Sequence, residues 1–314
     1  ENVRYALKAK QDFLWCANLP DEIFLNEVLP HYSINETRDR WRKEFYEIFT
    51  PLVKDCKDIY EAIDSINQNI IDVLGVEYNT ARIKADQSCF ESMEIGMASC
   101  TGLSILLVNA FRAVGIPARF AGTPMWTNMR GNHSWVEVWI DGEWYFTEYY
   151  PDALNKSWFL ADAGRADIED PQHWIYAVSY KPTDLFFPLK WLKNNDYVYA
   201  ENVTQRYIDL YRQQITNSSL TEDEIFLNIV LYESDYKDDG NCRISRRVDV
   251  LLDDSTVDFG YTPGPRDDLN RFLVLKLKKE TNYEFAFEGS NGEMRFVDYN
   301  TGIDCGEILK LFMN

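Results

Sequence analysis

The chain of 314 residues has few of the side chains that build metal centres and disulfide scaffolds. It contains three His (His31, His133 and His173) and six Cys, and no two Cys form a CxxC pair. Structural zinc sites use closely spaced Cys and His, and small secreted scaffolds depend on dense disulfides. The sequence therefore argues against both classes, and we expect no metal and no cofactor.

Basic residues and long apolar runs are also scarce. Lys and Arg number 32 against 51 Asp and Glu, a formal net charge of -19, which repels phosphate backbones. No apolar run approaches the roughly 20 residues that cross a bilayer. We expect neither a nucleic-acid partner nor a membrane span. The length, together with 46% hydrophobic residues, is ample for one large or two modest globular domains.

The first 85 residues have the texture of helices that pack on a later core. A helix is expected over 35–49, where Thr50 and Pro51 stop it, and a second over 58–74, ended by Gly75. The second helix places apolar side chains on one stripe, namely Ile59, Ile63, Ile66, Ile70 and Val73.

The segment 96–149 predicts a buried helix from about Cys100 to Val114, a strand over 118–121, and a hairpin. The hairpin joins HSWVEVWI to EWYFTEYY through Asp141 and Gly142, a pair that favours a two-residue turn. Beyond Asn217 the apolar runs have strand length and are separated by DDG, TPGP and SNG turns. Residues 216–314 are therefore expected to form an antiparallel β-sandwich, in which Cys242 and Cys305 could pair.

Cys100 is the first candidate for chemistry. At the start of a buried helix, unpaired N–H groups and the helix dipole favour an anion and lower a thiol pKa. A small buried cysteine in the core is the alternative interpretation.

His133 is the second candidate, and the hairpin supplies it with acids. In a two-residue turn His133 faces Tyr150, and Glu148 and Asp152 are its diagonal neighbours on the same face of the sheet. A carboxylate there would fix the imidazole tautomer and stabilise its charged form. Cys100, His133 and one carboxylate would make a thiol, a base and an orienting acid.

The motifs ASCTGLSILLVNAFRAVGIPAR, GNHSWVEVW and DGEWYF, in this order, resemble the transglutaminase-like superfamily. The resemblance implies an α+β fold, a papain-like transglutaminase core with N-terminal helices, followed by the β-sandwich. The resemblance covers about residues 20–207. We expect a helical lead-in over 1–85, the core and its extension over 86–215, and the sandwich over 216–314. The superfamily usually has Asp where this chain has Glu148, so Asp152 stays open as the acid. The flanks FLNEVLPHYSINETRDRWR and WFLADAGRADIEDPQHWIYAVSY resemble a bacterial, exported subgroup.

Candidates for the oxyanion donors and the substrate groove are less specific. The backbone N–H of Cys100 is one natural donor, and Gln87 or Trp126 could supply a second. Trp126 and Trp135 could line a groove or belong to the core.

Together these features predict a cysteine-dependent acyl-transfer enzyme that acts on amide bonds of peptides or proteins through a thioester. Cys100 is the expected nucleophile, His133 the base and Glu148 the orienting acid. Hydrolysis is the expected outcome, with amine transfer open. The alternative is a non-catalytic binding or scaffold protein with a degenerate site. We expect an exported protein, in the periplasm or at the cell surface.

Overall fold

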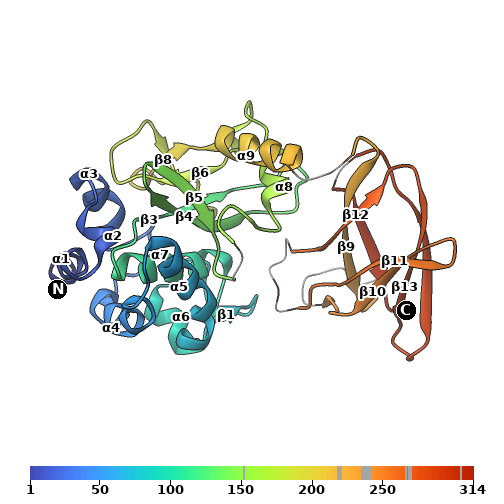
Figure 1. Ribbon diagram of the computed structural model, residues 1–314, viewed down its shortest axis with the longest axis horizontal. Helices are drawn as coiled ribbons and strands as arrows, with labels where there is room; N and C mark the ends of the chain where they lie inside the picture. The colour runs from blue at the N-terminus through green and yellow to red at the C-terminus, as the bar shows by residue number, and fades with distance from the viewer. Residues whose placement is uncertain (151–152, 218–220, 235–241, 266, 268–270, 305) are drawn as a thin grey trace. The chain divides into compact units, whose positions relative to one another are not determined.

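Figure 1 shows the computed structural model, which describes residues 1–150, 153–217, 221–234, 242–265, 267, 271–304 and 306–314. The chain forms two compact units, Glu1–Leu210 and Tyr211–Asn314. Among the described residues, no helix combines the length and the apolarity needed to span a bilayer. Asp152 and Cys305 lie outside the described residues, and with them the alternative acid and the Cys242–Cys305 pairing.

Helices make up most of the first 115 residues. They are α1 (Asn2–Asp12), α2 (Leu14–Ala17), α3 (Asp21–Ile23), the π-helical η1 (Phe24–Val28), α4 (Trp41–Val53), α5 (Ile59–Leu74), α6 (Cys89–Ile95) and α7 (Cys100–Ala113). Three further helical segments follow, α8 (Leu160–Ala163), the 3-10 turn η2 (Pro171–His173) and α9 (Thr204–Asn217), and α9 continues past the boundary between the units.

A six-stranded sheet completes the first unit. Its order is β5-β4-β3-β6-β8-β7 and all neighbours are antiparallel. The strands are β3 (Ala118–Thr123), β4 (His133–Ile140), β5 (Glu143–Thr147), β6 (Tyr176–Val178), β7 (Leu185–Phe186) and β8 (Tyr199–Asn202). A small parallel pair, β1 (Glu77–Tyr78) and β2 (Met97–Ala98), lies before α7. Figure 1 shows α4, α5, α6 and α7 together on one side of the large sheet.

The two expected N-terminal helices have different outcomes. The prediction for α5 is confirmed, with Asp58 accepting from the Glu61 N–H and Gly75 in the left-handed region at φ 64°. Of its stripe, Ile63, Ile66 and Ile70 are buried, Ile59 is half-buried and Val73 is 41% exposed. The bounds 35–49 are wrong for α4. Glu36 accepts from the N–H groups of Ser33 and Ile34, which holds that segment in a turn. Pro51 lies inside the helix and the helix ends soon after it, because proline lacks the N–H of its turn.

The hairpin forms as predicted. Asp141 and Gly142 have positive φ values of 50° and 102°, which a two-residue primed turn requires. The register pairs Val136 with Thr147 and Trp139 with Trp144. This register brings Glu148, just after β5, toward the start of β4.

One hydrophobic core joins the N-terminal helices, α7 and the sheet. Two buried arginines donate hydrogen bonds to backbone carbonyls within this core. Arg42 donates to Arg112 O at 2.8 Å, at the C-terminal end of α7, and to Val28 O and Pro30 O, both at 2.8 Å. Arg112 donates to Glu27 O at 3.1 Å and to Ala118 O at 2.9 Å. Guanidinium groups thus donate to carbonyls at the C-terminal ends of two helices.

The second unit is a β-sandwich of two sheets around a core of its own. One sheet has the order β11-β10-β13-β14 and the other β12-β9-β15. The strands are β9 (Glu224–Tyr232), β10 (Arg247–Leu252), β11 (Ser255–Tyr261), β12 (Leu273–Lys278), β13 (Asn282–Glu288), β14 (Met294–Asn300) and β15 (Ile308–Phe312). Its pairs are antiparallel, as expected, except that β15 runs parallel to β9.

Candidate functional site

Cys100 begins helix α7 and is the accessible residue of that helix. Ser99 caps the helix by accepting from the Gly102 N–H at 3.1 Å, and its hydroxyl donates to Ala85 O at 2.6 Å. Every other residue of α7 is buried, whereas Cys100 is half-buried. The thiol therefore lies at the positive end of a helix dipole, at a point that a small molecule can reach.

The start of β4 lies against the start of α7. The Thr101 and Ser134 hydroxyls, the immediate neighbours of Cys100 and His133, are 3.2 Å apart and hydrogen-bonded across 33 positions of sequence. On the other side of β4, His133 pairs with Thr123 of β3. The fold thus brings the segments of the two candidate residues together.

Glu148 binds His133 directly. Its Oε2 is 3.3 Å from His133 Nε2, and the two side chains are buried, with His133 3% and Glu148 9% exposed. The other carboxylate oxygen accepts from the hydroxyl of Ser157. A hydrogen bond at Nε2 leaves Nδ1 as the basic nitrogen of a neutral imidazole.

Aromatic rings surround the imidazole. Its centroid is 4.8 Å from that of Trp158, 5.1 Å from Phe159, 5.7 Å from Trp135 and 6.4 Å from Trp126. Trp126, Trp135 and Phe159 are buried, and Trp158 is half-buried. Trp158 is thus the ring of this group with surface left for a ligand.

Trp126 carries a buried donor. Among the described residues, no acceptor lies within hydrogen-bond reach of its indole N–H. The loop that carries Trp126 is closed by a hydrogen bond from its backbone N–H to Gly131 O at 2.8 Å. Asn128 and Arg130 of the same loop donate to Asp162 of α8, the former at 3.0 Å. A buried N–H without an acceptor is costly, so the Trp126 indole keeps an unused donor beside the ring of His133.

Two other sequence candidates have structural roles. Gln87 accepts from the Ile83 N–H at 3.0 Å, and its amide donates to Met97 O at 2.9 Å and Ser92 Oγ at 3.5 Å. Both amide hydrogens are used within this segment, so the structure does not offer Gln87 as an oxyanion donor. Trp135 is fully buried and donates to the Tyr207 hydroxyl at 2.6 Å, so it supports the histidine ring instead of lining a groove.

Ser157, Trp158 and Phe159 were not expected from the sequence. They lie in an irregular segment after the hairpin, where no periodicity indicates which side chains point inward. Within the described residues, no group of three or more His, Cys, Asp or Glu side chains could hold a metal ion.

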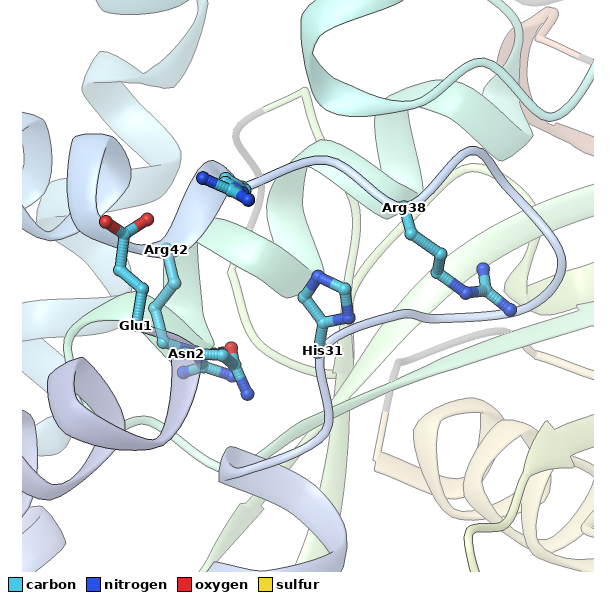
Figure 2. A pocket seen from close by; sticks show the side chains of 6 residues that line it. Glu1, Asn2, His31, Arg38 and Arg42 are labelled. Atoms are coloured by element: carbon cyan, nitrogen blue, oxygen red, sulfur yellow. Dashed lines mark hydrogen bonds between the residues drawn. The ribbon is translucent and has the colours of Figure 1, made fainter.

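A cavity of about 450 Å³ lies elsewhere in the first unit (Figure 2). None of the residues discussed above as chemical candidates lines it. The lining side chains are Glu1, Asn2, His31, Arg38, Arg40 and Arg42. Arg42 has its guanidinium bound to backbone carbonyls, and His31 Nε2 donates to Asp39 O at 2.9 Å. These two side chains therefore act first as parts of the fold.

Residues 47–149, which contain Cys100, His133 and Glu148, match the family model of the transglutaminase-like superfamily. The chain thus carries a transglutaminase-like core domain.

Three solved structures show a distant likeness, and the chain spans less than two thirds of each of them. A putative cysteine protease from Cytophaga hutchinsonii is 17% identical over 44% of this chain and 45% of its own, with a TM-score of 0.35. Red sea bream transglutaminase is 9% identical over 91% of this chain and 64% of its own, with a TM-score of 0.41. A TGase is 15% identical over 47% of this chain and 37% of its own, with a TM-score of 0.28. No curated protein matches the sequence significantly.

Proposed function

We propose that the protein is a cysteine-dependent acyl-transfer enzyme that acts on amide bonds of peptides or proteins. The observation that carries the proposal is the contact of 3.3 Å between Glu148 and His133, at a strand end that is hydrogen-bonded to the helix start bearing Cys100. A half-buried thiol, a base and a buried carboxylate in this arrangement are the parts of nucleophilic catalysis.

In the proposed reaction, His133 Nδ1 takes the proton of the Cys100 thiol, and the sulfur attacks the carbonyl carbon of the substrate amide. Glu148 stabilises the imidazolium that results. The backbone N–H of Cys100 stabilises the negative charge on the tetrahedral oxygen. The buried indole N–H of Trp126 is the proposed second donor. The imidazolium returns the proton to the departing amine as the carbon–nitrogen bond breaks and the thioester remains.

Water as the second substrate releases a carboxylic acid and restores the thiol, whereas an amine gives a new amide. We propose hydrolysis as the main outcome, on the resemblance of the sequence to bacterial members of the superfamily. Trp158, half-buried beside His133, is the proposed contact for the substrate chain. The catalytic segment is proposed to be 86–215, supported by the residues before it.

Alkylation by iodoacetamide tests the nucleophile without a known substrate. Cys56, also half-buried, is the reference thiol, and burial raises its pKa. We expect Cys100 to react at least about tenfold faster than Cys56 at pH 7, because an ordinary thiol is only a few per cent ionised there. Equal rates, measured by mass spectrometry of the labelled peptides, would favour a binding or scaffold protein with a degenerate site.

The acceptor is tested with glutamine-containing peptides in the presence and absence of an amine. Hydrolysis predicts a free acid as the main product in both cases, together with ammonia from a side-chain amide or a shorter peptide from a backbone amide. A main product that carries the amine would instead identify a transferase.

A further inference from the structure

The carboxylate of Glu148 has two hydrogen-bond partners, His133 and Ser157, one on each oxygen. Oε2 lies 3.3 Å from His133 Nε2, and Oε1 accepts from the Ser157 hydroxyl. Glu148 is 9% exposed, so water has little access to the second oxygen. A buried carboxylate oxygen needs a donor, and Ser157 provides it.

The segment that carries Ser157 is held firmly. Phe159, two residues on, is fully buried, with its ring centroid 4.4 Å from that of Trp135 and 5.0 Å from that of Phe146. The Leu160 N–H donates to Ser157 O at 3.2 Å. The Ser157 hydroxyl is therefore presented from a point that the core fixes, not from a free loop.

A glutamate in this place needs such an anchor. Its side chain has one more rotatable bond than aspartate, so a single hydrogen bond to His133 fixes its direction less well. A second bond to the other oxygen selects the rotamer that faces His133 Nε2.

We propose that Ser157 is a positioning residue of the active site. Its hydroxyl holds Glu148, and Glu148 in turn keeps His133 in the tautomer and orientation that exchange a proton with Cys100. This inference rests on the proposed function. It adds Ser157, which acts through Glu148, to the expected Cys100, His133 and Glu148.

Ser157→Ala tests the proposal in the full chain. Two readouts are used, the rate of Cys100 alkylation by iodoacetamide as a function of pH and the burst of p-nitrophenol from p-nitrophenyl acetate. We expect both rates at pH 7 to fall about tenfold, the effect of losing one hydrogen bond to a charged group. The pH profile of alkylation should also differ from that of the parent, since the imidazolium is less well stabilised.

Two variants separate positioning from general stability. Ser157→Thr keeps a hydroxyl. It should retain both rates within about threefold of the parent, because the energy of a single preserved contact varies on that scale. Ser179→Ala is the matched control, because the Ser179 hydroxyl is buried and donates to Lys181 O at 3.0 Å, outside the site. It should leave both rates unchanged.

A double-mutant cycle decides whether Ser157 acts through Glu148. In a Glu148→Ala background, Ser157→Ala should cause no further loss. An equal loss in both backgrounds would overturn the proposal, as would a Ser157→Ala protein with the parent's pH profile, or a Thr variant as slow as the Ala variant. If Cys100 of the parent reacts no faster than Cys56, the proposed function fails and takes this inference with it. A fast parent with an unaffected Ser157→Ala variant refutes the role of Ser157 alone.

Discussion

Helices α6 and α7 begin in the same way, with a serine cap followed by a cysteine, yet the two cysteines differ. Ser88 precedes Cys89 and Ser99 precedes Cys100, and each serine accepts from an N–H three residues on. Cys89 is 1% exposed, and its sulfur accepts from the Asn109 amide at 3.0 Å. Burial raises the pKa of the Cys89 thiol well above its ordinary value. Cys100 is half-buried and lies where α7 meets the strand that begins with His133.

The comparison separates two contributions to a reactive cysteine. At Cys89 the helix start does not yield a thiolate, because burial opposes the charged form and outweighs the helix dipole. Position at a helix start is therefore insufficient for a reactive thiol. In the proposed function, access to solvent and a nearby base distinguish Cys100 from Cys89.

The largest effect is expected from Cys100→Ala. The burst with p-nitrophenyl acetate should fall at least about a thousandfold, because the attacking atom is gone. Cys89→Ala is the matched control and should retain the burst per folded molecule. Substantial activity left in Cys100→Ala would place the nucleophile elsewhere.

Trp126→Phe should lower the turnover of an amide substrate by about a hundredfold, as the loss of one oxyanion donor does. The rate of Cys100 alkylation should not change, since iodoacetamide attack builds no oxyanion. Trp139→Phe, at a half-buried position of the same strand as His133, is the control. If alkylation and turnover fall together, Trp126 supports the fold of the site instead.

His133→Ala should make Cys100 behave like an ordinary thiol. At pH 7 its alkylation should slow by about thirtyfold, because no base takes the proton of the thiol. His173→Ala removes a histidine whose ring contacts Met125 O at 3.0 Å and should leave the rate unchanged. A His133→Ala protein that is alkylated as fast as the parent would exclude His133 as the partner.

The smallest effect concerns Cys89 and the stability of the fold at high pH. The folded state holds the Cys89 proton to a higher pH than the unfolded chain does, because burial raises its pKa. Stability from this group is present below about pH 8.5 and is lost as the pH rises above it, where only the unfolded thiol ionises. Urea midpoints should fall less between pH 7.5 and pH 10 in Cys89→Ala than in the parent. Equal falls would show that Cys89 does not contribute.

Local sequence signals predicted the parts of the site that local geometry decides. Alternation and the turn at Asp141 and Gly142 set the hairpin register, and the register brings Glu148 to His133. Ser157 could not be predicted in this way, since tertiary packing of Phe159 in an irregular segment decides where its hydroxyl points.

Two features of the second unit, strand β11 and the parallel pairing of β15, have weak signals in the sequence. β11 has a polar Asp258 and a Gly260 and presents exposed side chains such as Phe259, so it lacks an apolar run. The parallel pairing of β15 with β9 joins strands from opposite ends of the unit, which turn residues do not specify. Export and membership of a bacterial subgroup remain predictions from the sequence.

The arginine pair Arg42 and Arg112 bears on how far the molecule can be shortened. A fragment that began near residue 86 would keep α7 but lose Arg42, and with it the donor to Arg112 O. Arg112 would in turn lose Glu27 O and Tyr32 O as acceptors and remain a buried cation with fewer ligands. The N-terminal helices are therefore an integral part of the first unit, and recombinant versions of that unit should begin upstream of η1.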